Sequence, residues 1–305
     1  MIITKFLETR HNVIQKIIII GYLLVILVIY CSCSSQPKLE ETKIKRLALV
    51  IGNQNYNKDN SLENPINDAK GIANTLEDIG FDVILGLDLT LAELNEALAN
   101  LKAKIEPDNS MVFIYFAGHG NTLKKNPEET YLMMTDKKEK TLVSIYKFYA
   151  FLEDAKARYN IIAIDACRDY QKQYIVRGKE SNEKTLKNFR GNIRFDEGNK
   201  ADESVFLDNK YSYKMPGSTI VSYATMPYQR AKDWSVYDEE HSPYAYALMK
   251  YLDDEEIPIE EVFRRVRVDL LKETGRSQSN LEVVNLEKNI WLVPKKAGIS
   301  FSPPI

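Results

Sequence analysis

The stretch N-I-I-A-I-D-A-C-R-D at residues 160–169 decides how this chain folds. Its apolar residues follow one another without alternation, as in a strand that is buried on both faces of a parallel sheet. The run stops at Asp165, and a thiol, Cys167, follows among charged residues. In open α/β sheets, ligands and chemistry gather at the carboxyl ends of the strands. Cys167 is therefore the first candidate for a catalytic side chain.

Apolar strands and amphipathic helices alternate outward from this stretch. The expected strands cover residues 46–52, 81–87, 111–117, 160–165 and 217–225, with short ones at 131–134 and 291–293, and the expected helices cover 65–79, 90–105, 144–158, 242–251 and 259–273. This order predicts an α/β fold with a mostly parallel central sheet and helices on both faces. Right-handed crossovers would place the strand at 111–117 beside the strand at 160–165, with both ending at the same edge.

The composition limits the partners and the kinds of site that can be expected. The chain has 305 residues, 44% of them apolar, and a formal charge of −2, which gives no reason to expect nucleic acid as a partner. If the N-terminus is removed or serves as an anchor, Cys31 and Cys33 leave the globular part, and Cys167 is its only thiol. That excludes an intradomain disulfide and a Cys-rich zinc site, and we predict no metal site. His119 and His241 are then the imidazoles that could act with the thiol.

Residues 1–33 have the features of an export signal. Basic residues precede an apolar run at 17–30, which is short for a membrane span and suits the apolar region of a signal peptide. The following Y-C-S-C-S-S resembles a bacterial lipoprotein signal in which Cys33 carries the lipid, and residues 34–45 form a polar tether. We therefore expect an exported protein, attached to a membrane on its periplasmic or outer face. The alternative is an uncleaved, single-pass signal anchor.

His119 and Cys167 follow the ends of two strands that are expected to be neighbours. Adjacent strands lie about 4.8 Å apart, so the imidazole and the thiol would face each other as base and nucleophile. Gly118 and Gly120 flank the histidine, so the Gly120 N–H could approach a substrate oxygen and form an oxyanion hole with the Cys167 N–H. Taken alone, the cysteine could be a structural thiol and the histidine a loop residue. His241 is a weaker candidate base, because it lies in an acidic loop without glycines.

Two acidic residues are candidates for the floor of the same site. Asp165 precedes Cys167 by two positions, and residues two apart on a strand point to the same side. A buried carboxylate needs a partner, and a substrate Arg or Lys would supply one. Asp68, near the start of a predicted helix, is either a second pocket acid or a residue that stabilises the helix dipole. Two carboxylates would suit the planar fork of a guanidinium.

Seven pieces of the sequence resemble the caspase-like cysteine peptidases, specifically the bacterial metacaspase and paracaspase group. They are R-L-A-L-V-I-G-N-Q-N-Y at 46–56, L-E-N-P-I-N-D-A at 62–69, F-I-Y-F-A-G-H-G at 113–120, I-D-A-C-R-D at 164–169, S-Y-A-T-M-P at 222–227, S-P-Y-A-Y-A-L at 242–248 and I-E-E-V-F-R-R-V-R at 259–267. The resemblance implies a three-layer α/β/α sandwich and a catalytic dyad of His119 and Cys167. It also assigns Asp165 and Asp68 to the pocket for the residue before the cleaved bond, as in relatives that cut after Arg or Lys.

The resemblance also implies a domain organisation. A peptidase domain at 46–295 would consist of a large-subunit-like part at 46–169 and a small-subunit-like part at 215–295. The exposed, polar segment 170–214 would be the linker between them, a hypothetical site of self-cleavage, and residues 296–305 would form a tail.

We therefore expect a cysteine endopeptidase that acts on proteins or peptides with Arg or Lys before the scissile bond. No cofactor is required by the sequence. Calcium is left open as an activator, because some members of the family need it although no D-x-D-x-D-G loop is present. The alternatives are a caspase-fold peptidase of different specificity and a non-catalytic scaffold that binds a partner through residues 121–140 or the linker.

Overall fold

The computed structural model describes Gly21 and residues 44–56, 60–123, 126–136, 141–168 and 214–293. The predictions for the export signal with Cys33, for the tether up to residue 43, for the linker at 170–213 and for the tail lie outside these residues.

A central sheet of six strands organises the described part of the chain. Its order is β2 (Asp82–Leu87), β1 (Lys45–Gly52), β3 (Ser110–Ala117), β7 (Tyr159–Asp165), β8 (Thr219–Tyr223) and β9 (Leu281–Asn285). All neighbours pair in parallel except β8 and β9, which are antiparallel. The prediction of a mostly parallel sheet with β3 beside β7 is confirmed.

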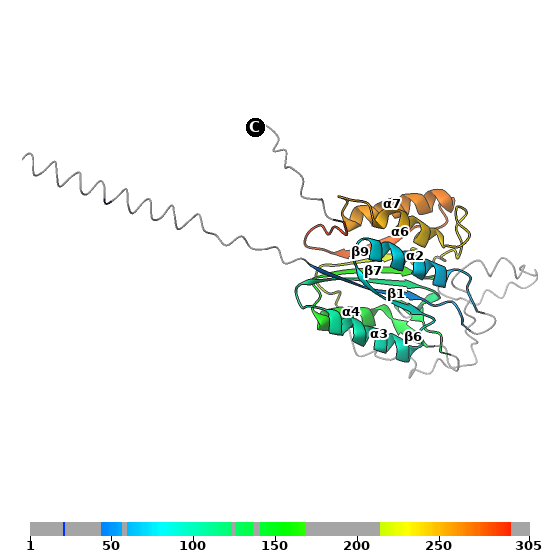
Figure 1. Ribbon diagram of the computed structural model, residues 1–305. Helices are drawn as coiled ribbons and strands as arrows, with labels where there is room; N and C mark the ends of the chain where they lie inside the picture. The colour runs from blue at the N-terminus through cyan, green and yellow to red at the C-terminus, as the bar shows by residue number, and fades with distance from the viewer. Residues whose placement is uncertain are drawn as a thin grey trace, which may run out of the picture. The chain divides into compact units, whose positions relative to one another are not determined.

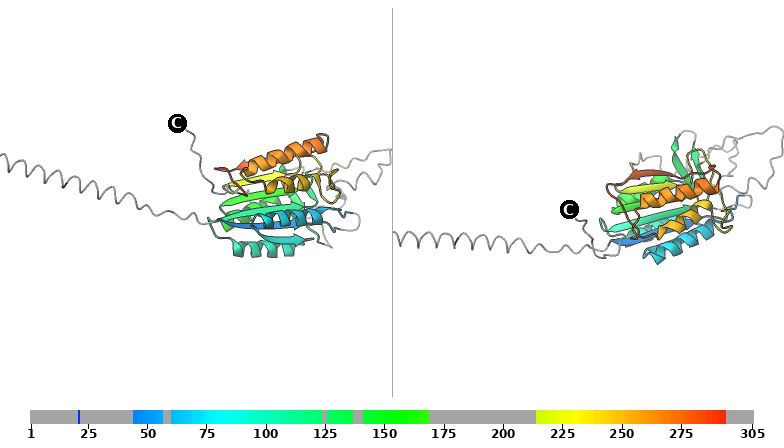
Figure 2. Two further views of the ribbon diagram at one scale, coloured as in Figure 1. Left: turned by 45° about the horizontal axis from the view of Figure 1, so that its top comes forward. Right: turned by 90° about the horizontal axis from the view of Figure 1, so that it is seen from above.

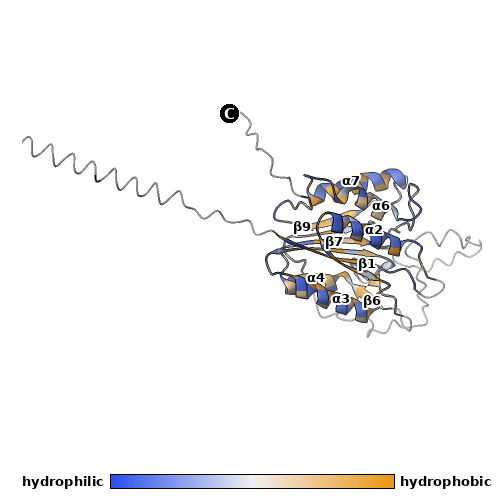
Figure 3. Ribbon diagram, in the orientation of Figure 1, coloured by the Kyte–Doolittle hydropathy of each residue, from blue (hydrophilic) through white to orange (hydrophobic). Residues whose placement is uncertain are grey.

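Helices cover both faces of this sheet, so the fold is the predicted three-layer α/β/α sandwich. As Figures 1 and 2 show, α2 (Pro65–Asp78), α6 (Pro243–Leu252) and α7 (Ile259–Glu273) lie on one face, and α3 (Leu91–Lys104) and α4 (Ile145–Ala155) lie on the other. Figure 3 shows apolar strands between helices whose outward faces are polar.

The unalternating strands follow from this arrangement. Along β3, Phe113 and Tyr115 belong to the core under α2, α6 and α7, while Ile114 and Phe116 belong to the core under α3 and α4. All four are fully buried. Because each face of the strand packs against helices, both sets of alternate residues must be apolar.

Local sequence signals set where the helices begin. Pro65 occupies the first turn of α2, where its missing N–H costs nothing. The predicted capping box forms at α3: the Thr90 side chain accepts from the Glu93 N–H, and the Glu93 carboxylate accepts from the Thr90 N–H. Ser144 and Ser242 cap α4 and α6 in the same way through their hydroxyl groups.

Two sequence predictions need correction. The segment after β3 contains a three-stranded antiparallel sheet of β4 (Gly120–Leu123), β5 (Asn126–Met133) and β6 (Leu142–Ser144), where only one short strand was expected. The last strand is β9 rather than residues 291–293, and Trp291 makes only a single bridge to Pro258. β9 is an edge strand whose valines are about half exposed, so it lacks the apolar run by which the buried strands were found.

Candidate active site

The register of β3 and β7 places His119 and Cys167 at matching positions. Ala117 pairs with Asp165 at the last step of the parallel ladder. His119 and Cys167 each lie two residues beyond that pair, just after the ends of two strands that are about 4.8 Å apart. The structure therefore brings the two residues to the same edge of the sheet, as the sequence predicts.

Glycine is required at Gly120, where the histidine loop meets the cysteine loop. A Cβ atom at this position would lie 2.6 Å from the Cys167 carbonyl oxygen and 2.6 Å from the Ala166 Cβ. Gly118 adopts a φ of +155°, and a Cβ there would lie 2.5 Å from the Tyr56 hydroxyl. The two glycines thus let the backbone around His119 pack closely against its neighbours.

The imidazole of His119 is buried and oriented by two residues that precede α2. Its ring centroid lies 4.6 Å from that of Tyr56, whose hydroxyl accepts the His119 backbone N–H at 3.0 Å. Its Nε2 lies 2.6 Å from the carbonyl oxygen of Asn60. A carbonyl oxygen can only accept, so this contact places a proton on Nε2. In the neutral ring, Nδ1 is then the basic nitrogen.

The thiol of Cys167 is fully buried beneath the loop between β8 and α6. The Ala231 N–H donates to Sγ at 3.1 Å, and the Ala231 carbonyl oxygen lies 3.7 Å from Sγ. Next to it, the Arg168 N–H donates to the Gln229 carbonyl at 3.0 Å, and the Tyr228 N–H donates to the Arg168 carbonyl at 2.9 Å. In this conformation the loop covers the sulfur completely.

Arg168 anchors the cysteine loop to the rest of the fold. Its Nε donates to the Thr130 hydroxyl at 3.0 Å, its guanidinium carbon lies 4.1 Å from the centroid of the Tyr223 ring, and its carbonyl accepts from the Thr122 hydroxyl at 3.2 Å. Burial lowers the pKa of the Arg168 guanidinium and raises the pKa of the Tyr223 hydroxyl. The only signal for this arginine in the sequence is its position next to the thiol, and that position alone predicts no role.

The two predicted pocket acids meet at Ser242. The Ser242 hydroxyl donates to Asp165 Oδ2 at 2.5 Å, and the Ser242 N–H donates to Asp68 Oδ1 at 2.9 Å. The Tyr115 hydroxyl donates to the same Oδ2 of Asp165 at 3.2 Å. Asp68, Asp165, Tyr115 and Ser242 are all fully buried. The structure thus brings the two acids together, and it adds Ser242, which the sequence marked only as a helix cap.

Burial raises the pKa of the nearby Tyr244 hydroxyl, and the negative charge of Asp165 acts in the same direction. That hydroxyl donates to the Ser222 side chain at 2.8 Å, which lowers the pKa by a smaller amount than burial raises it. The Tyr244 hydroxyl therefore stays neutral beside Asp165.

Contacts between α2 and the loop before α6 hold this cluster in place. The Asn64 side chain donates to the carbonyls of Asp233 and Glu239 at 2.8 Å and 3.0 Å. The Asp233 carboxylate accepts the Glu63 N–H at 2.7 Å. These bonds fix the end of the loop at Ser242 over the first turn of α2, where Asp68 lies.

His241, the alternative base, makes different contacts. Its Nδ1 lies 2.9 Å from Asp238 Oδ2 in its own loop. Its Nε2 would be 3.1 Å from a Cβ placed on Gly71 of α2. His241 thus lies against its own loop and α2.

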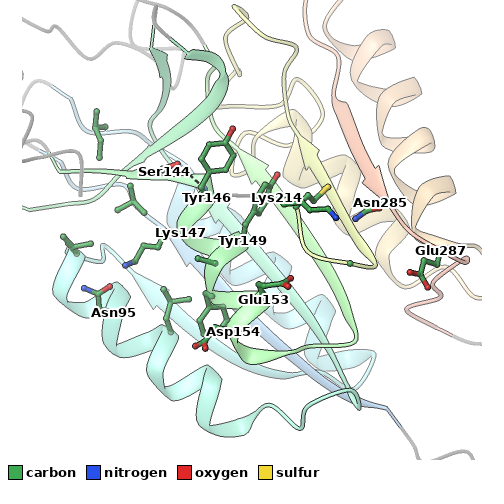
Figure 4. Close-up of a pocket in the computed structure, with 18 residues that line it drawn as sticks. Asn95, Ser144, Tyr146, Lys147, Tyr149, Glu153, Asp154, Lys214, Asn285 and Glu287 are labelled. Carbon is green, nitrogen blue, oxygen red and sulfur yellow. Dashed lines mark hydrogen bonds between the residues drawn. The ribbon is translucent and has the colours of Figure 1, made fainter. Parts of the chain in front are cut away.

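A groove in the described structure lies away from these residues. It has a volume of about 1130 Å³ and is lined by residues of α3, α4 and the segments at 214–217 and 285–287. Figure 4 shows Tyr146, Lys147 and Tyr149 along it. None of the candidate catalytic residues lines it.

Neither a metal site nor a membrane helix is found in the described ranges. They contain no group of three or more His, Cys, Asp or Glu side chains that could hold a metal ion. Among them, no helix combines the length and apolar character needed to cross a membrane.

The fold defines the class of the protein. The chain is similar to the crystal structure of caspase-1 from Spodoptera frugiperda, with a TM-score of 0.57 and 14% sequence identity over 84% of this chain and 93% of that one. An identity this low shows a shared caspase fold and no more.

The sequence then gives the family. The family model of the caspase domain matches residues 45–290, and this chain belongs to that family of cysteine peptidases. It is also 24% identical, over 127 residues, to the human mucosa-associated lymphoid tissue lymphoma translocation protein 1. That match covers 40% of this chain and 15% of the human protein.

Proposed function

We propose that this protein is a cysteine endopeptidase that cleaves peptide bonds after Arg or Lys. The observation that carries the proposal is the pair of buried carboxylates, Asp165 and Asp68, which are both hydrogen-bonded to Ser242. Asp165 lies two residues before the candidate nucleophile, Cys167. Two carboxylates held by one residue suit a cationic ligand, and the planar fork of a substrate guanidinium can donate to both of them.

The proposed reaction proceeds through a thioester. The Cys167 thiol gives its proton to His119, and the sulfur attacks the scissile carbonyl; the S–C bond forms, and the Gly120 and Cys167 N–H groups hold the oxyanion. His119 passes this proton to the leaving amine as the C–N bond breaks. His119 then takes a proton from water, whose oxygen attacks the thioester; the S–C bond breaks, the proton returns to the sulfur, and the acid product leaves.

Catalysis in this scheme requires the loop over the thiol to move. A substrate carbonyl needs the position next to Sγ that Ala231 occupies. The loop is joined to the cysteine loop by the two backbone hydrogen bonds of Arg168 and by the bond from the Ala231 N–H to Sγ. Opening at this point breaks these bonds, and contacts with a bound substrate would offset their loss.

A panel of short fluorogenic peptides tests the proposal. The peptides carry Arg, Lys, Asp or citrulline before the reporter, since citrulline has the shape of arginine without its charge. We expect the full-length protein to cleave the Arg and Lys peptides at least about 100-fold faster than the others, and Cys167→Ala to abolish cleavage. Equal rates for Asp and Arg, or an active Cys167→Ala variant, would contradict it.

The covered thiol also favours a second candidate, a caspase-fold scaffold without peptidase activity. In that case the Cys167→Ala variant would keep the full biological effect of the protein. Loss of that effect in the variant, at normal expression, would reject the scaffold.

Self-processing in the segment 170–214 is a separate proposal, based on its basic residues. They include Arg177, Lys184, Arg190 and Arg194. Mass spectrometry of active, purified protein should show cleavage after one of them. An active protein with only intact chain would reject self-processing.

We also propose that Cys33 carries the lipid that attaches the protein to a membrane. Mass spectrometry of the N-terminal peptide, from wild type and from Cys33→Ser, should show a lipid mass in the wild type alone. An unmodified N-terminus beginning at Met1 would favour the signal anchor.

Activity measured with a calcium chelator, and again after calcium is restored, tests whether calcium is an activator.

A further inference from the structure

We propose that Ser242 is a specificity-determining residue, which positions both pocket acids for the positively charged substrate side chain. The inference rests on the proposed function, because it assigns a role inside the same pocket. It concerns a residue whose sequence signal is only that of a helix cap.

Ser242 offers one donor to each acid. Its hydroxyl donates to Asp165 Oδ2 at 2.5 Å, and its backbone N–H donates to Asp68 Oδ1 at 2.9 Å. The same hydroxyl oxygen accepts the Ala245 N–H at 2.9 Å. Because that N–H already occupies one side of the oxygen, the hydroxyl proton is directed at Asp165. The serine is fully buried, so no water competes for these bonds.

The two hydrogen bonds of Ser242 affect the charges of Asp68 and Asp165. Asp68 and Asp165 carry like charges, and their repulsion in a buried site opposes the charged form of both. Donors that point at the carboxylate oxygens stabilise the negative charges and fix their orientation. The partial positive charge at the start of α6, which Ser242 caps, acts in the same direction. Ser242 thus lets the pocket hold two negative charges at defined positions before the substrate arrives.

A purely structural role makes a different prediction. As a helix cap alone, Ser242 would affect how much of the protein is folded and would change the turnover of every substrate by the same factor. As a positioning residue for the acids, it affects charged substrates selectively. The ratio of kcat/KM for Arg and citrulline peptides separates the two roles, because it does not depend on the folded fraction.

The test compares Ser242→Gly with Ser242→Thr in the full chain. Glycine is nearly as good a helix cap as serine but has no hydroxyl, and its backbone N–H to Asp68 remains. Threonine keeps the hydroxyl. We expect Ser242→Gly to lower the Arg-to-citrulline ratio by about 10-fold or more, mainly through a higher KM for Arg. Ser242→Thr should restore the ratio to within about 3-fold of wild type.

Thr90→Ala is the matched control. Thr90 caps α3 on the opposite face of the sheet and contacts none of the pocket residues. Removing the Thr90 hydroxyl should lower the melting temperature of the protein and leave the Arg-to-citrulline ratio of kcat/KM unchanged.

The outcomes distinguish this inference from the proposed function. An unchanged Arg-to-citrulline ratio in Ser242→Gly, in a protein whose wild type prefers Arg, would overturn the role of Ser242 and leave the proposed function intact. A wild-type protein that does not distinguish Arg from citrulline would overturn the proposed function and the role of Ser242 with it.

Discussion

The proposed catalytic pair and the proposed acid pocket lie at the same edge of the sheet but are built in different ways. His119 and Cys167 come from two neighbouring strands, and their position follows from one register. The acids and Ser242 come from α2, β7 and α6, with sequence separations of 174 and 77 residues between the serine and its two partners. The sheet therefore fixes the proposed chemistry, while the proposed selectivity depends on how two helices dock against it.

This difference leads to separable effects. Changes in the catalytic pair should slow the cleavage of every substrate. Changes in the acid pocket should act on substrates with a charged side chain before the scissile bond and spare neutral ones. Kinetics of each variant with the same Arg and citrulline peptides test that separation.

Replacing His119 should have the largest effect. In His119→Ala the leaving amine has no proton donor, so we expect kcat to fall by about 1000-fold or more for both peptides. The Arg-to-citrulline ratio should stay within about 3-fold of wild type, because the pocket acids are untouched. Steady-state kinetics on protein with a wild-type circular dichroism spectrum measure both quantities.

His241→Ala is the control for this variant, since His241 makes its contacts with Asp238 and α2. It should keep nearly all of the activity. A variant of His241 as inactive as His119→Ala would reject the assignment of the base.

Asp165→Asn should have the next largest effect. The amide has the shape of the carboxylate without its charge, so kcat/KM for the Arg peptide should fall by about 100-fold. The value of kcat/KM for the citrulline peptide should fall much less. Asp82→Asn is the control: Asp82 lies on the edge strand β2, where its exposed carboxylate pairs with Lys104. Equal losses for both peptides in Asp165→Asn would show that this acid serves the fold or the chemistry rather than selectivity.

The sequence allowed the catalytic pair to be predicted more completely than the pocket. Two uninterrupted apolar runs predicted β3 and β7, and right-handed crossovers made them neighbours, so His119 and Cys167 could be placed together. Asp165 followed from its spacing on the same strand.

The loop between β8 and α6 could not be predicted in the same way. Its backbone reaches Cys167 across 64 residues through the N–H of Ala231, and any residue except proline can supply such a donor. Ser242 carried a visible signal for a helix cap, but a cap does not indicate which side chain its hydroxyl will meet. Contacts of this kind depend on how α6 docks, and only the structure shows them.

Tyr115→Phe should produce the smallest effect. It tests how much the acid pocket depends on β3, the strand that also leads to His119. The change removes the second donor to Asp165 Oδ2, whose hydrogen bond of 3.2 Å is longer than the one from Ser242. Phenylalanine fills the same space in the core, so the fold should be kept. Because the Ser242 hydroxyl still holds the carboxylate, we expect the Arg-to-citrulline ratio to fall by only about 3-fold. A loss as large as that of Ser242→Gly would mean that the two donors act as one unit, and that the selectivity of the pocket depends on β3 as well as on the docking of the helices.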